Sequence, residues 1–344
     1  GKGDKAKPYQ SLALALRKAG SGSTLRVAAG TYKGDLLVKA RSVVLLGGFA
    51  QGFAVRDAQK HRSVLQGSGK DAVLTLLSAG KTKVDGFTIR GGGGSSRAGA
   101  KEVYGGGVYI TGGSVTISHC VIEENSTTRK KGEIQQAGGG IYARSGDLTL
   151  VDSVIRKNTS KRGGGLALME LRRATVKRNL IEDNIAVGDH GGGVYAACKD
   201  LRFSHNVVQG NEVGRKIGYG WGGGVTIIGK MTRARFEKNL LTKNFAASLG
   251  SGYFIDDESQ ATLSEELIVA NVCAPEGGSA IFVDGLDPKK GSRAALSKCT
   301  IGEHPCGGAV AGNALRADQS SSVEIVDSVL WNNGKKPLSK GKRS

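Results

Sequence analysis

The sequence of 344 residues has little proline and no long apolar run. Only 5 residues are proline against 55 glycines, which argues against both a collagen repeat and a proline-rich linker. No apolar segment approaches the roughly 20 residues that a membrane-spanning helix needs. We therefore expect no membrane span. The 39% of apolar residues is enough to build a hydrophobic core.

Acidic residues are also few. The 30 Asp and Glu residues face 49 Lys and Arg residues, which gives a formal net charge of +19. A charge of this size attracts polyanions over long distances, so nucleic acid and acidic polysaccharide are the candidate partners. Aromatic residues make up only 5% of the chain and no known nucleic-acid-binding module is present, which makes nucleic acid the less favoured partner.

A glycine-rich segment recurs along the chain, as GGGVYI from Gly105, GGGIYA from Gly138 and GGGVYA from Gly191. Each copy is followed by a β-branched segment, such as VTI or LTL, and then by a third short segment that ends in asparagine. These asparagines lie 26 to 33 residues apart and are Asn125, Asn158, Asn184, Asn211, Asn244 and Asn271. A period of this length indicates one supersecondary unit per repeat.

The repeat predicts an all-β fold, a single right-handed parallel β-helix with three short strands per coil. Strands this short bury a face only when successive coils stack, and parallel crossovers are overwhelmingly right-handed. The apolar residues alternate with period two, which excludes a helical solenoid. The recurring asparagines should form a hydrogen-bonded ladder along the stack.

Three segments follow from this pattern. Residues 1–24 should form a capping segment, in which PYQSLALALRK from Pro8 to Lys18 is an amphipathic helix that covers the open first coil. Residues 25–333 should form the β-helix. Residues 334–344 should be a basic, disordered tail.

The chain has five cysteines, so at most two disulfides can form. Cys273 and Cys306 occupy the same loop of successive coils, and we expect them to be bonded. Cys120 and Cys299 share one turn position but lie too many coils apart to meet, and Cys198 should also be free. One disulfide suits a secreted, periplasmic or cell-surface protein.

The segment between each asparagine and the next glycine-rich strand varies in length. It has 12 residues at 126–137, 4 at 159–162, 6 at 185–190 and 10 at 212–221. Two long loops should therefore flank two short ones and form a groove roughly 14 Å wide. The expected floor holds Lys161, Arg162, Asp189 and His190. The expected walls hold Arg129, Lys130 and Lys131 on one side and Arg215, Lys216, Tyr219 and Trp221 on the other.

Cations beside aromatic rings suit a chain of acidic sugars, because guanidinium groups clamp carboxylates and flat rings stack on sugar faces. A row of aromatic residues just after the glycines adds Tyr142 and Tyr195 to the binding candidates, if the flanking Val108 and Ile110 face inward. The alternative is that these rings only cover the glycine-rich sheet. The row consists of Tyr109, Tyr142, Tyr195, Phe254 and Phe282.

If the groove is catalytic, β-elimination on a uronic acid fits its residues best. The reaction needs a cation for the carboxylate, a base and an acid. Arg162 or Arg215 would neutralise the sugar carboxylate. Lys161 or His190 would be the base, and Tyr219 would be the acid. The alternative is that these are solvated loop charges. Hydrolysis would need two facing carboxylates, and Asp189 has no evident partner except Glu133.

No cofactor is required for this chemistry. Asp256, Asp257 and Asp284 follow equivalent strands of neighbouring coils and could gather oxygen ligands for Ca²⁺; ordinary turn residues are the alternative. Glu123, Arg156 and Glu182 form a column of alternating charge, which predicts cross-strand ion pairs.

Several motifs together carry a resemblance: the segment STLRVAAGTY, the repeated GGG[VI]Y with [VIL]xxN, and the closing VDSVLWNNG. They resemble secreted bacterial right-handed β-helix proteins of the pectin-lyase-like superfamily, especially glycine-rich members related to polymorphic outer-membrane repeats. The resemblance covers nearly the whole chain and implies the fold. It leaves activity open, because the superfamily includes lyases, hydrolases, epimerases and non-catalytic surface proteins.

Two hypotheses follow. The first is an extracytoplasmic, monomeric protein that binds acidic polysaccharide, with polysaccharide lyase activity as its catalytic form. The second is a non-catalytic cell-surface or adhesin-type repeat protein. The WxDH-type motif of pectate lyases and the paired aspartates of polygalacturonases are both absent from the sequence.

Overall fold

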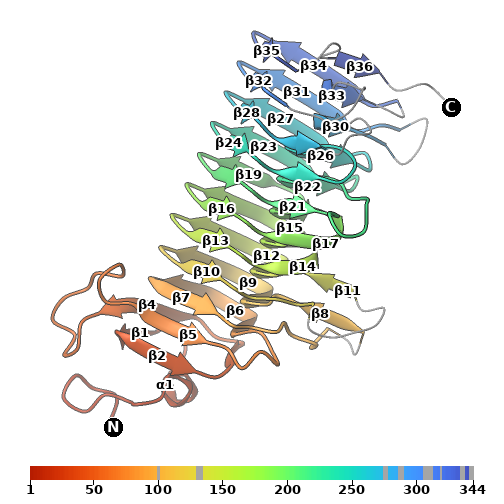
Figure 1. Ribbon diagram of the computed structural model, residues 1–344. Helices are drawn as coiled ribbons and strands as arrows, with labels where there is room; N and C mark the ends of the chain where they lie inside the picture. The colour runs from red at the N-terminus through yellow and green to blue at the C-terminus, as the bar shows by residue number, and fades with distance from the viewer. Residues whose placement is uncertain are drawn as a thin grey trace.

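The computed structural model describes residues 1–98, 101–128, 135–273, 278–285, 290–304, 313–317, 320–333 and 338–340. The chain forms a rod of stacked coils, with the N-terminus at one end and the C-terminus at the other (Figure 1). Its strands pair in parallel with the equivalent strands of neighbouring coils and form three long sheets. This confirms the predicted parallel β-helix.

The first sheet contains both the glycine-rich strand and the β-branched strand that follows it. In four coils the two are one continuous strand, and in the other coils they are separate. Its members are β1 (Ser23–Ala28), β3 (Leu36–Lys39), β4 (Val43–Phe49), β6 (Leu74–Asp85), β9 (Val108–Ser118), β12 (Ile141–Val151), β15 (Leu166–Lys177), β18 (Val194–Ala197), β19 (Leu201–Ser204), β22 (Val225–Ile228), β23 (Arg233–Glu237), β26 (Tyr253–Asp256), β27 (Gln260–Ser264), β30 (Ser279–Val283), β31 (Arg293–Ser297), β33 (Asn313–Ala317), β34 (Ser322–Val326) and β36 (Leu338–Lys340).

The second sheet contains the strands that lead to the asparagines. Its members are β2 (Gly30–Lys33), β5 (Ser63–Gln66), β7 (Phe87–Arg90), β10 (Val121–Glu123), β13 (Val154–Arg156), β16 (Leu180–Glu182), β20 (Val207–Gln209), β24 (Leu240–Thr242), β28 (Leu267–Val269), β32 (Thr300–Gly302) and β35 (Val329–Trp331). Strand β5 is the second strand of this sheet from its N-terminal end. It pairs with β2 and β7 and so continues the sheet.

The three sheets fit the predicted three strands per coil, but the third sheet lies in segments that we expected to be loops. Short strands between the asparagine position and the glycine-rich strand pair from coil to coil. They are β8 (Glu102–Tyr104), β11 (Gln135–Ala137), β14 (Thr159–Arg162), β17 (Ile185–His190), β21 (Glu212–Val213), β25 (Phe245–Ala246) and β29 (Val272–Cys273). Some have only two residues, too few for an alternating pattern to be visible in the sequence.

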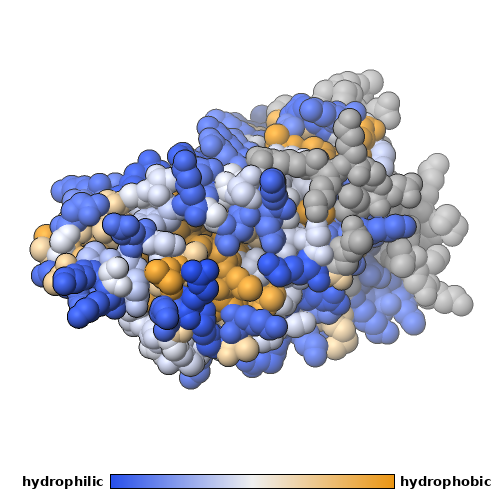
Figure 2. All heavy atoms as spheres, turned by 90° about the horizontal axis from the view of Figure 1, so that it is seen from below, coloured by the Kyte–Doolittle hydropathy of each residue, from blue (hydrophilic) through white to orange (hydrophobic). Residues whose placement is uncertain are grey.

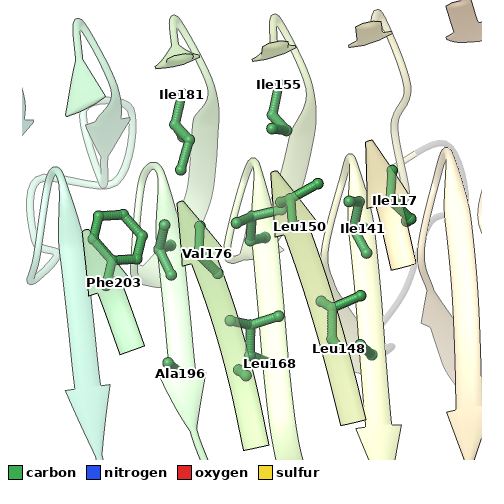
Figure 3. Packing of buried hydrophobic residues seen from close by; sticks show 14 of the residues in the cluster. Ile117, Ile141, Leu148, Leu150, Ile155, Leu168, Val176, Ile181, Ala196 and Phe203 are labelled. Carbon is green, nitrogen blue, oxygen red and sulfur yellow. The ribbon is translucent and has the colours of Figure 1, made fainter. Parts of the chain in front are cut away.

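The interior of the rod is apolar and continuous. Ile117, Leu150, Val176 and Phe203 occupy the same position in successive coils and are nearly completely buried. Ile155 and Ile181 of the second sheet face them across the interior (Figure 3). Each coil therefore extends one core instead of building its own.

The predicted asparagine ladder is present and buried. Each side-chain amide donates to the side-chain oxygen of the next asparagine, at 3.0 Å from Asn125 to Asn158 and 2.9 Å from Asn184 to Asn211. The ladder continues beyond Asn271 in a changed form, because the Nδ1 of His304 accepts from the backbone N–H of Asn271 at 3.2 Å.

A second ladder runs parallel to the first at the preceding turn, and the sequence analysis missed it. The Oδ1 of Asn206 accepts from the amide of Asn179 at 3.0 Å, and the Oδ1 of Asn239 accepts from Asn206 at 3.0 Å. The ladder then changes residue type, since the Oε1 of Glu266 accepts from the side-chain amide of Asn239 at 2.8 Å. This mixture of residues hid the repeat.

One helix, α1 (Leu12–Lys18), lies at the N-terminal end and is shorter than the predicted Pro8–Lys18. The Ser11 side chain accepts from the N–H of Leu14 and begins the helix there. Leu12, Ala15 and Leu16 are buried in the main core. Figure 2 shows an apolar area among hydrophilic residues at this end of the rod.

At the other end, β36 lies within the segment 334–344 that we expected to be disordered, and it pairs with β33. Cys120, Cys198 and Cys299 are free and buried, as predicted. Cys306 lies outside the described residues, so the Cys273–Cys306 disulfide stays a prediction. No helix in the described ranges is long and apolar enough to cross a membrane.

Candidate functional site

An open pocket of about 510 Å³ lies on the third sheet, which we call the third-sheet pocket. It combines residues of three successive coils and of the long segment 214–221. Lys161, Arg162, Asp189 and Tyr219, all expected in the groove, lie together in its lining. The full lining is Gln135, Gln136, Lys161, Arg162, Val187, Gly188, Asp189, Ile217 and Tyr219.

A local irregularity in the sheet shapes the floor. Ser160 pairs with Ala186, but the next pair is Arg162 with His190, so β17 has two extra residues at this point. Such a bulge bends the strand and redirects its side chains. Gly188 lies in the bulge, where a Cβ would come within 2.5 Å of the carbonyl oxygen of Lys161. Only glycine fits there, and its place in the sequence is a signal that the sequence analysis did not use.

The centre of the pocket is a two-pronged ion pair. The Nε and Nη2 of Arg162 donate to the two carboxylate oxygens of Asp189 at 2.8 and 3.0 Å. Burial opposes ionisation of Asp189, but His190 and Arg162 outweigh it and hold the pKa of this carboxyl well below its usual range. Asp189 is therefore ionised at neutral pH, and it neutralises the cation that we had expected to neutralise a substrate carboxylate.

His190 is packed into a cluster of rings. Its Nδ1 lies 3.2 Å from Oδ1 of Asp189, and its side chain is 16% exposed. The ring centroid lies 5.1 Å from that of Trp221, 5.8 Å from that of Phe254 and 5.9 Å from that of Tyr195. The imidazole is thus mostly covered, and it does not line the pocket.

The long segment after β21 presents one ring and one aliphatic side chain to solvent beside the floor. Tyr219 is 50% exposed and Ile217 is 42% exposed. The ring of Tyr219 lies 5.9 Å from that of Trp221, with the two ring planes tilted by 52°. An exposed aromatic ring offers a stacking surface to a flat ligand ring.

Arg215 and Lys216, also predicted for this wall, are not among the residues that line the pocket. Arg215 donates to a carboxylate oxygen of Glu212 at 2.6 Å, and its guanidinium lies 3.9 Å from the ring centroid of Phe245. These two contacts keep the guanidinium of Arg215 outside the lining of the pocket. Lys216 is exposed. Arg129, Lys130 and Lys131, expected in the opposite wall, lie outside the described residues.

The aromatic row after the glycines is in register, as predicted. Tyr109 pairs with Tyr142, and Phe254 with Phe282, with Val108 and Ile110 facing the core. Tyr142 is only 4% exposed, because it stacks between Tyr104 and Tyr109 with ring centroids 4.4 and 5.7 Å away. Burial raises its pKa. In this structure Tyr142 is therefore part of a covering cluster instead of a ligand surface.

The charged column on the second sheet is confirmed as a structural feature. A carboxylate oxygen of Glu123 accepts from Arg156 at 2.7 Å, and Glu182 lies 3.9 Å from the same guanidinium. These residues pair across neighbouring coils. Their charges are satisfied within the sheet.

The three carboxylates considered for calcium are not arranged as a metal site. The Oδ1 of Asp256 accepts from the N–H of Asp257, and the Oδ1 of Asp284 accepts from the N–H of Gly285, which are local turn contacts. Within the described ranges, no group of three or more His, Cys, Asp or Glu side chains is arranged to hold a metal ion.

Comparison with known proteins agrees with this geometry. The family model described as "right handed beta helix region" matches residues 72–249, slightly more than half of the chain. The protein therefore belongs to this right-handed β-helix family, which confirms the predicted handedness. A search of curated proteins and a search of solved structures each gave no significant match.

Proposed function

We propose that this protein binds a chain of acidic sugars across the third-sheet pocket. The observation that carries the proposal is that Lys161, Arg162 and Tyr219 line one open pocket. Two cationic side chains next to an exposed ring suit a ligand that has both carboxylates and flat sugar faces. The net charge of +19 would draw such a polymer toward the rod.

The ion pair on the floor leaves part of Arg162 for a ligand. Asp189 takes Nε and Nη2, and among the described residues no hydrogen bond is formed by Nη1. A sugar carboxylate at Nη1 would be bound by a guanidinium whose orientation is already fixed. Fixing a side chain in advance reduces the entropy lost on binding.

Binding without cleavage is the form of the proposal that fits these contacts best. β-Elimination needs a cation for the carboxylate and a base that reaches the C5 proton. Asp189 already neutralises Arg162, and His190 is covered by three rings. Lyase activity is kept as an outcome of the test below.

We also place the protein outside the cytoplasm, as a non-catalytic sugar-binding module. The support is the resemblance of its repeats to secreted proteins of the pectin-lyase-like superfamily, together with the predicted Cys273–Cys306 disulfide.

Titration calorimetry with polygalacturonate and alginate tests the proposal, with the neutral polymer dextran as the reference. We expect binding to the two polyuronates alone, weakened about tenfold in Tyr219→Ala, since stacked aromatic contacts and their buried area amount to about 1.4 kcal/mol or more. Lys216→Gln is the matched control, because Lys216 lies in the same segment but outside the lining.

Two results would change the conclusion. No binding of either polyuronate, or equal binding by Tyr219→Ala and the unmodified protein, would refute the proposal. A rise in ultraviolet absorbance during incubation, caused by unsaturated sugar ends, would show that the protein is a lyase and does more than bind.

A further inference from the structure

Another cationic surface lies on the outer side of the first sheet, away from the third-sheet pocket. Strands β15, β19 and β23 belong to three successive coils and lie side by side (Figure 1). Their inward residues Ala174, Leu201 and Ala234 are buried in the core. Alternation along a strand therefore turns the neighbouring residues outward. We call four of these, Arg173, Arg202, Arg233 and Arg235, the arginine face.

One carboxylate organises this surface. Asp200 lies 3.2 Å from Arg173, 3.4 Å from Arg202 and 2.9 Å from Arg235. These three arginine side chains remain 51%, 54% and 62% exposed. Arg233, which lies two residues before Arg235 on β23, is exposed as well. Three of the four arginines thus share the single carboxylate of Asp200.

Asp200 does not consume the hydrogen-bonding capacity of the face. A guanidinium has five N–H donors, and the contacts to Asp200 use Nε of Arg173, Nε of Arg202 and Nη1 of Arg235. The remaining N–H donors of these three side chains are not used by Asp200. Such an arrangement binds anionic oxygens through charge-assisted hydrogen bonds.

The rest of this surface is flat and polar. The other outward residues of these strand segments and of β27 are Thr175, Lys177, Ser204, Glu237, Gln260, Thr262 and Ser264. None is aromatic or apolar. Bases of single-stranded nucleic acid bind by stacking on aromatic rings, and membrane surfaces take up apolar side chains. The surface therefore favours an anionic polysaccharide over these two partners.

We propose that the arginine face is a second binding surface for polyuronate, which runs along the axis of the rod. Arg202 and Arg235 are directly paired on adjacent coils, which stack about 4.8 Å apart. This step is close to the length of one sugar in an extended chain, so neighbouring guanidiniums and neighbouring sugars have a similar spacing along the rod. The proposal takes its polymer from the proposed function, but it uses other residues.

The double variant Arg202→Gln/Arg235→Gln tests the arginine face, with titration of polygalacturonate as the measurement. The matched control is Arg144→Gln/Arg178→Gln, which removes the same charge from two arginines that are each paired with one carboxylate outside the face, Glu170 and Asp152. All four side chains are exposed, and unchanged melting temperatures will verify the fold. We expect about tenfold weaker binding in the first variant, as charge-assisted hydrogen bonds are lost, and less than twofold in the control.

Equal weakening in both double variants would mean general charge attraction and would overturn the proposal, as would no weakening in either. Tyr219→Ala separates the two sites. If only Tyr219→Ala weakens binding, polyuronate binds at the third-sheet pocket and the proposal for the arginine face is refuted. If only Arg202→Gln/Arg235→Gln weakens binding, polyuronate binds at the arginine face and the proposal for the pocket is refuted. Single-stranded DNA of equal charge is the second probe. If DNA binds more tightly than polygalacturonate and the face variant weakens that binding, the ligand of the arginine face is nucleic acid and the proposal of polysaccharide is overturned.

Discussion

The hydroxyl of Tyr253 donates a hydrogen bond of 2.5 Å to Oε2 of Glu266 inside the core of the rod. Tyr253 is completely buried and Glu266 is 1% exposed. Glu266 occupies an asparagine position of the second ladder, where its other oxygen accepts from Asn239. An ionisable group thus stands in a chain of neutral amides.

Glu266→Gln should stabilise the protein at alkaline pH and remove a pH dependence. Burial raises the pKa of Glu266 to about 7, from 4.5. Because the pKa of Glu266 is higher in the folded protein, protonated Glu266 stabilises the fold fully below 4.5, the pKa of the unfolded chain. This stability is lost as pH rises through 7. We expect a gain of about 1–3 kcal/mol at pH 8 and little change at pH 5, measured by urea unfolding. Glu265→Gln, an exposed neighbour, is the control. Identical pH profiles for Glu266→Gln and the unmodified protein would contradict this prediction.

His304→Asn should reduce sensitivity to acid. Burial lowers the pKa of His304 to about 4, from 6.5, so the unfolded chain takes up a proton that the folded protein excludes. The stability due to neutral His304 is therefore present above pH 6.5 and is lost as pH falls toward 4. Asparagine restores the ladder residue and does not titrate. The melting temperature of the variant should fall less between pH 7 and pH 4.5, whereas exposed His205→Asn should behave like the unmodified protein.

Asp189→Asn should strengthen polyuronate binding and weaken the fold slightly. The change breaks the ion pair that occupies Nε and Nη2 of Arg162 and removes a negative charge from the pocket. We expect severalfold tighter binding of polygalacturonate, because removal of the negative charge outweighs the lost orientation of Arg162. We also expect a loss of about 1 kcal/mol in unfolding free energy, because both groups are partly exposed. Calorimetry and urea unfolding check the two parts. Weaker binding would show that Asp189 contacts the ligand directly.

Asn184→Ala should cost about 2–4 kcal/mol. Its Oδ1 accepts from the backbone and side chain of Asn158, and its Nδ2 donates to Ile155 and Asn211. The substitution leaves several buried polar groups without partners. Urea unfolding measures the loss, and the exposed Thr262→Ala should change the free energy by less than about 0.5 kcal/mol. A small effect at Asn184 would mean that water replaces the amide.

The coil, its period and the main ladder could be predicted because one residue type, asparagine, recurs at a fixed place. The second ladder could not, since it begins with Ser153, continues through three asparagines and ends in Glu266. The third sheet was missed because its shortest strands have two residues and acquire their structure only from neighbouring coils.

Within the candidate site, the sequence predicted the meeting of Lys161, Arg162, Asp189 and Tyr219 but not how they pair. Arg162 and Asp189 are 27 residues apart, which is one coil, so their contact was within reach of the periodicity argument. The covering of His190 and Tyr142 by other rings could not be predicted in this way, because it depends on rings from several coils.

The bulge at Gly188 shows how tolerant this architecture is of change. Strand β17 has two residues more than β14 at this point, yet the pairs on either side of the difference keep their hydrogen-bonded partners. Extra residues in one coil project sideways while the neighbouring coils stay in place. Small insertions and deletions at this edge can therefore reshape a recognition surface one layer at a time, without selection having to rebuild the scaffold.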